Sequence, residues 1–267
     1  MRLDVYLKDR GFSSRTRAAR AIVEGRVLVN GKPARASDEI RETDLVEVRE
    51  EEEKFASEGG KKLRRFFNLF PVERADGLVF ADLGASTGGF CDVLLKGGAR
   101  RVYAVDVGEG QLEARIAGDE RIVVMDRTNA RYLTKESFPE RIDAVTGDLS
   151  FISLRLILPA VADILSPGGK AYLLCKPQFE CGGKGLDKHG VVKDEGIRAG
   201  IVQKVCAAAS VLGLHAFAAA ETVPPGRGNR EYVLGFVRGD GKARDYAAFA
   251  AEAAEKGRAV FSGTGRV

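Results

Sequence analysis

The stretch that most constrains the fold of this chain spans residues 78–90, where an apolar run meets an acid and a glycine-rich loop. It reads Leu-Val-Phe-Ala-Asp-Leu-Gly-Ala-Ser-Thr-Gly-Gly-Phe. The apolar run at 78–81 predicts a buried strand, and the glycines after it predict a tight turn into a helix. In open α/β sheets, ligands bind beyond the carboxyl ends of the strands. The stretch therefore predicts a site for a nucleotide-like cofactor.

The spacing of the glycines indicates which cofactor the loop holds. A dinucleotide fingerprint needs glycine at its first, third and sixth positions, which here are Gly84, Ser86 and Gly89. Because the middle glycine is missing, a dinucleotide oxidoreductase is the weakest interpretation. The loop instead follows an acid, Asp82, and ends in the adjacent Gly88 and Gly89, which suits a ligand with an ammonium group and no phosphate. S-adenosylmethionine is such a ligand.

Two further predicted strands also end in an acid. The largely apolar residues 101–105 precede Asp106, and residues 122–125 precede Asp126. We expect Asp106 to bind the two ribose hydroxyls of an adenosine and Asp126 to meet the adenine edge. A single acid at a strand end is as often a helix cap or a solvated turn. Three acids at successive strand ends behind one glycine loop favour a cofactor site.

The rest of the larger part of the chain alternates strands and helices. Strands are predicted over 142–148, 170–176, 215–223 and 231–237, and helices over 154–165, 194–212 and 245–256. Charged residues stand at three of the strand ends, namely Asp148, Lys176 and Glu231. The alternation predicts an α/β fold with a seven-stranded, mostly parallel sheet and helices on both faces. We expect the glycine- and lysine-rich loop 178–193 to close over a substrate.

Residues 1–50 are predicted to form a separate small domain with a basic character. Residues 1–35 contain nine Lys or Arg against three acids, although the net charge of the whole chain is only +4. The pattern predicts a helix over 3–7, a second helix capped by Ser13 or Ser14, and paired strands at 27–29 and 44–48 with an Asn30-Gly31 turn. Nucleic acid is the usual partner of a compact basic patch.

This small domain resembles the α-L RNA-binding module first known from a small-subunit ribosomal protein. The resemblance is carried by Arg2-Leu-Asp, Ser14-Arg15, Arg17, Ala18, Ile22, Gly25, Val27, Val29, Asn30 and Gly31. It implies that one face of the second helix packs on the core while the other presents arginines to RNA. The expected RNA-binding residues are Arg2, Arg15, Arg17, Arg20 and Arg26.

An acid-rich linker is predicted over residues 51–58, and the larger domain over 59–267. The larger domain opens with a helix that carries Lys62 in its first turn.

No apolar run approaches the roughly 18 residues needed to cross a bilayer, and the N-terminus lacks the apolar core of a signal peptide. We therefore expect a cytoplasmic protein with no membrane partner. The four cysteines show no paired spacing, so neither a metal site nor a disulfide is expected.

Several separate motifs make the chain similar to the hemolysin A (TlyA) family. They are residues 82–90, Asp126-Arg-Thr-Asn, residues 147–154 and Lys176-Pro-Gln-Phe-Glu, in that order. The resemblance implies an α-L module joined to an FtsJ-like RNA ribose 2′-O-methyltransferase domain with a Rossmann-like methyltransferase fold. It also implies a catalytic tetrad of Lys62, Asp148, Lys176 and Glu231. The chain departs from the family pattern at Glu58, where the family usually has an arginine.

The chemistry gives each tetrad member a physical reason. A ribose 2′-hydroxyl is a weak nucleophile, so a nearby cation that stabilises the developing alkoxide lowers the barrier. Lys176 is expected to be that cation, or the base if its pKa is lowered. Asp148 would position Lys176 and face the methyl donor, Lys62 would hold the substrate ribose or phosphate, and Glu231 would orient a lysine. The expected cofactor-binding residues are Asp82, Gly84, Ser86, Gly88, Gly89, Phe90, Asp106, Asp126 and Asp148.

The leading hypothesis is an S-adenosylmethionine-dependent methyltransferase that acts on a ribose 2′-oxygen of ribosomal RNA or ribosomal subunits. One alternative is a noncatalytic RNA-binding factor in ribosome assembly that keeps the methyltransferase fold. Another is the membrane-damaging activity suggested by the older family name. The lack of a membrane-spanning run counts against direct lysis.

Overall fold

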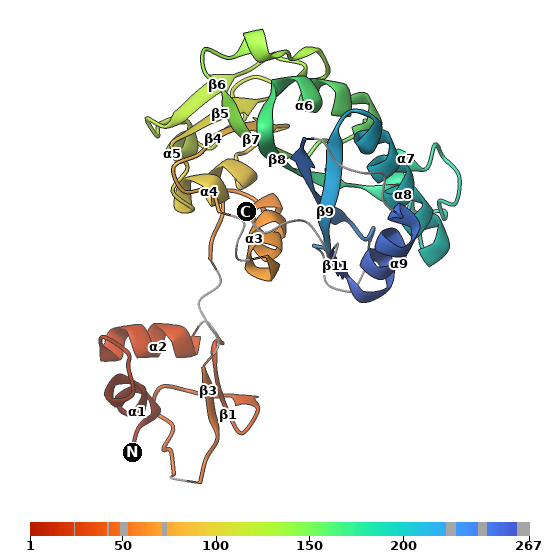
Figure 1. The fold of residues 1–267 in the computed structure, drawn as a ribbon. Coiled ribbons are helices and arrows are strands. Elements are labelled where there is room, and N and C mark those ends of the chain that lie inside the picture. Colours follow the sequence, from red (N-terminus) through yellow and green to blue (C-terminus); the bar gives the residue numbers. More distant parts are fainter. Residues whose placement is uncertain are drawn as a thin grey trace. The chain divides into compact units, whose positions relative to one another are not determined.

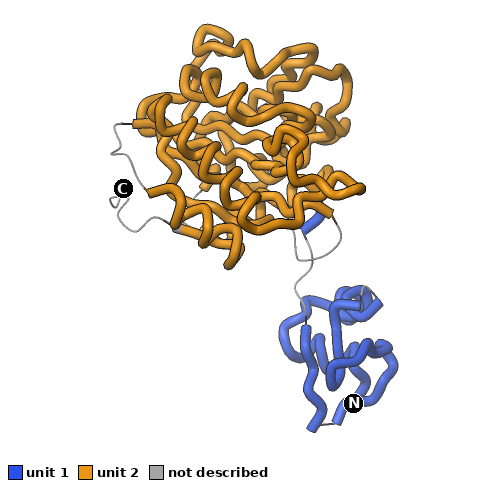
Figure 2. The backbone as a smooth tube through the Cα atoms, turned by 90° about the vertical axis from the view of Figure 1, so that its right-hand side faces the viewer, with its two compact units in different colours: residues 1–54 blue, residues 55–267 orange. Residues whose placement is uncertain are grey.

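The computed structural model describes residues 1–23, 25–41, 43–48, 53–70, 74–222, 228–239 and 245–260. The chain divides into two compact units, Met1–Lys54 and Phe55–Val267 (Figure 2). Each unit has its own hydrophobic core, so each is described separately. Residues 51 and 52 of the predicted linker lie outside the described residues, as does residue 223 of the predicted sixth strand.

In its described residues, the first unit consists of two helices packed on a small antiparallel sheet of order β2-β1-β3 (Figure 1). Its elements are α1 (Leu3–Asp9), α2 (Arg15–Val23), β1 (Val27–Val29), β2 (Lys32–Pro33) and β3 (Val46–Val48). Asn30 and Gly31 both have positive φ, 52° and 74°, which suits a two-residue hairpin turn. The turn leads from β1 into β2, and β3 pairs along the other edge of β1. Ser14 Oγ accepts a hydrogen bond from Arg17 N at 3.2 Å, as the predicted cap requires.

The second unit is built on one sheet of order β11-β9-β10-β8-β7-β4-β5-β6 (Figure 1). Its strands are β4 (Val79–Leu83), β5 (Arg101–Val105), β6 (Ile122–Met125), β7 (Ile142–Gly147), β8 (Leu165–Cys175), β9 (Leu214–Glu221), β10 (Tyr232–Arg238) and β11 (Arg258–Val260). Strands β4 to β8 run parallel, whereas β10 is antiparallel to β8 and β9. The prediction of a mostly parallel α/β sheet is confirmed, but within the described residues the sheet has eight strands instead of seven.

The additional strand is β11, which pairs antiparallel with β9. It follows α9 (Tyr246–Lys256) directly, after Gly257 turns the chain with a φ of 66°. The strand is three residues long, which is too short for an alternating pattern to show. Only its pairing with β9 identifies it.

The boundary between α6 (Leu158–Ile164) and β8 also differs from the prediction. A helix was expected over 154–165 and a strand from residue 170, with Pro167, Gly168 and Gly169 as a break between them. Instead β8 begins at Leu165 and runs through all three residues. Its register against β7 shifts there, and Gly168 has a φ of 77°. A proline that cannot donate to the ladder is tolerated at such an irregularity.

Helices cover both faces of the large sheet and divide its core into two hydrophobic clusters (Figure 1). One face, here called the α3 face, is covered by α3 (Glu58–Leu69), α4 (Gly89–Lys96) and α5 (Ala114–Ala117). The other is covered by α6, α8 (Glu195–Val211) and α9. The connections hold the short helix α7 (Pro177–Glu180) and the 3-10 turns Ala130–Tyr132, Lys135–Ser137 and Leu154–Leu156.

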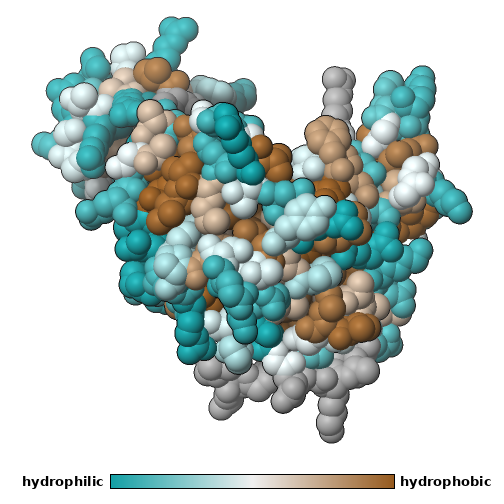
Figure 3. All heavy atoms as spheres, turned by 90° about the horizontal axis from the view of Figure 1, so that it is seen from above, coloured by the Kyte–Doolittle hydropathy of each residue, from teal (hydrophilic) through white to brown (hydrophobic). Residues whose placement is uncertain are grey.

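No helix in the described ranges is both long enough and apolar enough to cross a bilayer. On the face shown in Figure 3, hydrophobic side chains lie in several separate groups among hydrophilic ones. The large apolar side chains exposed in the described residues include Val23 in the first unit and Tyr132, Phe151 and Val211 in the second.

Glycines let the first turn of α3 approach the start of α4 closely. A Cβ placed on Gly60 would lie 2.8 Å from the carbonyl oxygen of Gly89 and 2.5 Å from Cβ of Phe55. A Cβ on Gly89 would collide with Ser57 Oγ. These glycines are therefore needed for packing, and they bring Lys62 over the carboxyl ends of the strands.

We predict that Gly60→Ala lowers the free energy of unfolding by about 1–3 kcal/mol, the usual cost of an overpacked contact. The matched control is Gly200→Ala in the interior of α8, where nothing lies within 4 Å of the added Cβ. That control should raise the free energy of unfolding by about 0.5–1 kcal/mol, because alanine is the better helix former. Urea unfolding followed by circular dichroism measures both, and a Gly60→Ala protein as stable as its parent would contradict the packing argument.

Candidate active site

Side-chain alternation along β4 and β7 directs two acids to the α3 face. In β4, Phe80 packs in the cluster beneath α3 and α4, so Asp82, two residues later, points the same way. In β7, Thr146 Oγ1 donates to Asp82 Oδ1 at 2.8 Å and must therefore share that face. Asp148 follows Thr146 by two residues, just past the end of β7. The two strands thus deliver Asp82 and Asp148 to the same side of the sheet.

The register of β8 and β10 brings Lys176 and Glu231 together. The last pair in this antiparallel ladder is Cys175 with Tyr232. Lys176 follows the first and Glu231 precedes the second, so they occupy the next positions across the two strands. Both are buried, at 8% and 9% exposure. Leu174 belongs to the cluster beneath α3, which places Lys176 on that face too.

The buried Lys176 forms an ion pair with Asp148, whose side chain is 20% exposed. Its Nζ lies 2.7 Å from Asp148 Oδ1 and also donates to Ser150 Oγ at 2.8 Å. A buried ammonium is tolerated only when it is paired and hydrogen-bonded. Asp148 and Ser150 come from the segment after β7, and Lys176 from the end of β8, so this pair joins two neighbouring strand ends.

Lys62 forms the second ion pair of the site, with Glu231. Its Nζ lies 2.6 Å from Glu231 Oε2, while Gln178 Nε2 donates to Glu231 Oε1 at 3.2 Å. Lys62 stands one helical turn before the buried Phe66 of α3, and this places it above the sheet. Both oxygens of Glu231 are therefore occupied, one from α3 and one from α7.

The two ion pairs lie beside each other beneath the start of α3. A Cβ on Gly59 would lie 3.1 Å from Asp148 Oδ2, which shows how closely the first turn of α3 covers that carboxylate. Lys176 and Glu231 occupy neighbouring positions at the β8 and β10 ends. The structure thus brings together Lys62, Asp148, Lys176 and Glu231, the four residues expected to form a tetrad.

The glycine loop after β4 has a backbone with positive φ at three positions. Gly84, Ser86 and Gly88 all have positive φ, at 79°, 46° and 93°. A Cβ on Gly84 would lie 3.0 Å from the backbone oxygen of Asp148, so the loop abuts the ion-paired acid. Ser86 N donates to Asp106 Oδ2 at 2.9 Å, which ties the loop to the end of β5.

The acids at the next two strand ends, Asp106 and Asp126, are half-buried, and Asp106 contacts this loop. Asp106 Oδ1 accepts from Gly108 N at 2.8 Å, and Asp126 Oδ2 accepts from Gly110 N at 2.8 Å. The segment after β5 is thereby held between the two carboxylates. Asp106 and Asp126 each keep acceptor capacity, because a carboxylate has about four lone-pair sites.

Four of the residues expected to touch a cofactor are buried, namely Asp82, Gly88, Gly89 and Phe90. Asp82 is 0% exposed, and its Oδ2 accepts from Cys91 Sγ at 3.1 Å. It therefore links β4 to α4 through Cys91 and to β7 through Thr146. Burial raises the pKa of Asp82 to about 6, although the hydrogen bonds from Cys91 and Thr146 oppose the shift. Phe90 is 3% exposed and packs in the core beneath α3.

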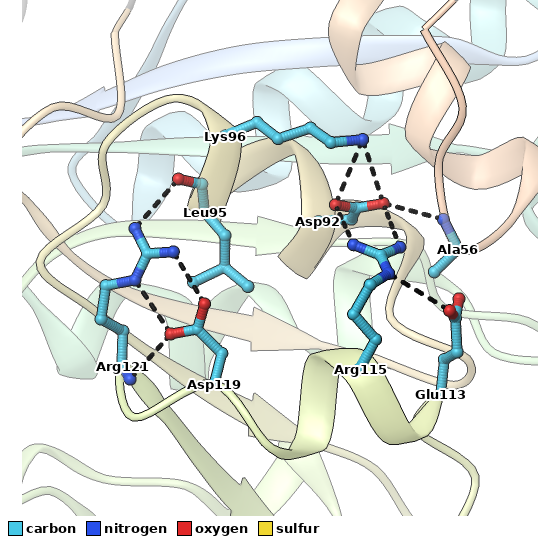
Figure 4. Close-up of polar contacts among 8 residues, drawn as sticks. All are labelled: Ala56, Asp92, Leu95, Lys96, Glu113, Arg115, Asp119 and Arg121. Carbon is cyan, nitrogen blue, oxygen red and sulfur yellow. Dashed lines mark hydrogen bonds and ion pairs between the residues drawn. The ribbon is translucent and has the colours of Figure 1, made fainter.

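A charged cluster centred on Asp92, which the sequence did not indicate, braces the start of the second unit (Figure 4). Asp92 is 1% exposed and accepts from both terminal nitrogens of Arg115 at 3.1 and 3.0 Å, from Lys96, and from Ala56 N at 3.0 Å. Burial would raise the pKa of Asp92, but Arg115 and Lys96 outweigh it and the pKa is lowered. The cluster joins the chain just before α3 to α4 and α5.

An exposed aromatic pair at the rim of the site was also missed. Phe151 is 91% exposed and has a φ of 61°, which is rare for a residue with a bulky side chain. Its ring centroid lies 5.1 Å from that of Phe179, and Lys176 Nζ lies 5.9 Å from the Phe179 ring. A phenylalanine in an apolar run predicts burial, so this exposure could not be predicted from the local sequence.

In the first unit, Asp4 holds two of the expected RNA-binding arginines. Arg2 Nε lies 3.0 Å from Asp4 Oδ1, and Arg15 Nη2 lies 2.7 Å from Asp4 Oδ2. Hydrogen bonds from both guanidinium groups lower the pKa of Asp4 to about 2. Both arginine side chains are about half exposed, at 52% and 55%. Arg17 and Arg20 lie exposed on α2, and Arg26 is half-buried.

The fold and the site together define the class of this protein. Residues 55–238 match the FtsJ-like methyltransferase family, and residues 1–46 match the S4 domain. No group of three or more His, Cys, Asp or Glu side chains suited to a metal ion occurs in the described ranges. The second unit is thus an FtsJ-like methyltransferase domain, and the first is an S4 domain.

The chain belongs to the hemolysin A (TlyA) family, which the resemblance in its motifs had implied. It is 42% identical over 239 residues to the 16S/23S rRNA (cytidine-2′-O)-methyltransferase TlyA of Mycobacterium tuberculosis, covering 87% of this chain and 88% of that one. It is 36% identical to Hemolysin A of Brachyspira hyodysenteriae, over 89% of this chain and 100% of that one. A solved structure described as a hemolysin from Streptococcus thermophilus matches with a TM-score of 0.72 and 33% identity, over 96% and 95% of the two chains.

The raised pKa of Asp82 predicts a specific pH dependence of stability. An acid whose pKa is raised from 3.8 to about 6 on folding binds its proton more tightly in the folded state. Its contribution is therefore fully present below about pH 4 and is lost as the pH rises through about 6. We predict that the free energy of unfolding of the wild type, minus that of Asp82→Asn, falls by on the order of 2–3 kcal/mol between pH 4 and 7. Chemical unfolding across that range measures the difference, and a flat difference would contradict the assignment.

Proposed function

We propose that this protein transfers a methyl group from S-adenosylmethionine to a ribose 2′-oxygen of ribosomal RNA. The observation that carries the proposal is the ion pair of the buried Lys176 with Asp148, set beside the glycine loop at Gly84. The M. tuberculosis relative, named as an rRNA (cytidine-2′-O)-methyltransferase, supports the choice of substrate. Ribosomal subunits would be the partner and the cytoplasm the place of action.

The residues at the carboxyl ends of β4 to β7 fit S-adenosylmethionine. The positive φ values at Gly84, Ser86 and Gly88 let the backbone turn tightly at the carboxyl end of β4, next to Asp148. Half-buried carboxylates of Asp106 and Asp126 stand at the next two strand ends, and they suit the ribose hydroxyls and the adenine edge. When bound, S-adenosylmethionine supplies an electrophilic methyl group on a sulfonium centre.

Lys176 would stabilise the attacking oxygen. An ammonium group has three N–H donors, and those of Lys176 already include one to Ser150 and a contact to Asp148. We assign a remaining donor to the 2′-oxygen, where it stabilises the negative charge that develops as the hydroxyl proton leaves to water. Asp148 keeps the ammonium in place and presents a negative charge toward a cationic methyl donor.

Lys62 and Glu231 would hold the substrate ribose. One N–H of the Lys62 ammonium donates to Glu231. The other N–H donors are left for a ribose hydroxyl or the neighbouring phosphate. Glu231 is fixed by Gln178 as well as by Lys62, so it orients the lysine and does not face solvent freely. Holding the hydroxyl near the methyl group converts the reaction into an effectively unimolecular step.

Two other surfaces would bind RNA. The exposed ring of Phe151, backed by Phe179, offers a platform on which the base of the target nucleotide can stack. In the S4 domain, the proposed phosphate contacts are Arg2, Arg15, Arg17, Arg20 and Arg26. Asp4 holds Arg2 and Arg15 next to each other, which pre-organises a pair of cations for adjacent phosphates.

We predict that Lys176→Ala lowers kcat for methyl transfer to ribosomal subunits by about 100-fold or more, because a preorganised donor to the oxyanion is lost. Its affinity for S-adenosylmethionine should stay within about threefold, since Lys176 acts on the nucleophile. The control is Lys204→Ala, an exposed lysine of α8 that should retain full activity. Tritium transfer from labelled cofactor measures kcat. Normal transfer by Lys176→Ala would refute the catalytic assignment.

We predict that Phe151→Ala raises KM for the RNA substrate by roughly 5- to 100-fold, which corresponds to the 1–3 kcal/mol typical of a base stacked on an aromatic ring. Cofactor affinity should not change, because the ring lies at the rim. Val211→Ala removes a side chain of similar exposure, 87%, at the end of α8 and should leave KM unchanged. Steady-state kinetics with varied RNA concentration tests this, and an unchanged KM for Phe151→Ala would exclude stacking as a binding contribution.

A further inference from the structure

Glu180 is a buried carboxylate that lies outside the four tetrad residues. Its side chain is 2% exposed, at the end of the short helix α7, four residues after Lys176. Glu180 Oε1 accepts from Leu154 N at 2.5 Å, and Oε2 accepts from Ser153 Oγ at 2.6 Å. Arg155 Nε lies 3.6 Å from Oε2. All three partners come from the segment that follows β7.

This contact is the last of three between the same two segments. One segment is residues 148–155, after β7, and the other is residues 176–180, after β8. At the near end, Lys176 binds Asp148 and Ser150. In the middle, Phe151 packs on Phe179. At the far end, Glu180 binds Ser153, Leu154 and Arg155. The Glu180 carboxylate therefore makes the last of three contacts that fix residues 148–155 against residues 176–180.

We propose that Glu180 is a positioning residue that holds residues 148–155 against the Lys176 segment, so that Asp148, Ser150 and Phe151 keep their places. For activity, this inference rests on the proposed methyl transfer. Phe151 has a φ of 61°, a conformation that persists only where the surroundings fix it. Glu180 supplies that constraint two residues further along, through Ser153 and Leu154.

Hydrogen bonding, more than charge, would carry this role. Glu180→Ala leaves the backbone N–H of Leu154 buried without an acceptor and frees the Ser153 hydroxyl. Glu180→Gln can keep both bonds, because its amide oxygen can accept from Leu154 N while its amide nitrogen donates to a rotated Ser153 hydroxyl. The two variants thus separate a positioning role from a need for the negative charge.

The first test measures methyl transfer to ribosomal subunits. Glu180→Ala should lower kcat by about 100-fold, the loss typical of a misplaced reacting group. Glu180→Gln should keep kcat within about threefold of wild type, and Ser153→Ala should fall between the two. The control is Glu140→Ala, which removes a carboxylate bound to Arg100, Arg101 and Tyr103 near the starts of the parallel strands. It should leave kcat unchanged.

The second test reads the position of the segment without any catalysis. The chain contains no tryptophan, so Phe151→Trp introduces a single selective fluorophore into residues 148–155. In that background, Glu180→Ala should lower the fluorescence anisotropy and increase quenching by acrylamide, whereas Glu180→Gln should change neither. If Glu180→Ala does not fold, Ser153→Ala takes its place in both tests.

The outcomes separate the two proposals. Lower anisotropy together with a loss of kcat in Glu180→Ala, both restored in Glu180→Gln, supports the positioning role. Unchanged anisotropy, or a kcat within threefold of wild type in Glu180→Ala, overturns it. If the wild type itself transfers no methyl group, the proposed function fails, and the anisotropy alone then decides whether Glu180 holds the segment.

Discussion

The candidate site depends on one buried cation, the ammonium of Lys176. A buried charge is costly unless its donors are satisfied, so Asp148 and Ser150 must stand within hydrogen-bonding distance of it. Strand alternation sends the side chains to the same face, and the start of α3 covers the acid closely at Gly59. The sheet, α3 and the loops thus meet around the ammonium of Lys176. We assign its remaining N–H donor to a substrate oxygen.

Much of the fold could be predicted from the sequence because a parallel sheet buries both faces, and its strands appear as apolar runs with an acid or a lysine where each run ends. The eighth strand and the start of β8 could not. The three residues of β11 carry no pattern of their own. Residues 167–169 look like a break, yet the ladder continues past them because β7 tolerates a shift in register. Both features depend on partners that are distant in the sequence.

The site could be predicted from the sequence to about the same extent as the fold. Carboxyl ends of parallel strands share one edge, so acids and lysines at those ends were expected to meet, and Lys176 and Asp148 do. Whether such a residue faces a ligand or the interior depends on the helix that packs above it. Asp82 is enclosed for this reason, beneath Cys91. The exposure of Phe151 and the contacts of Glu180 depend on how residues 148–155 pack against residues 176–180. The local sequence does not encode that packing.

The central claim is that the methyl group is transferred to a ribose oxygen. The most direct measurement incubates ribosomal subunits with this protein and labelled S-adenosylmethionine, then hydrolyses the RNA in alkali. A 2′-O-methyl group blocks the hydroxyl that cleaves the neighbouring phosphodiester, so the account predicts label in alkali-resistant dinucleotides. Label recovered only in single nucleotides would place the methyl group on a base and would contradict the account.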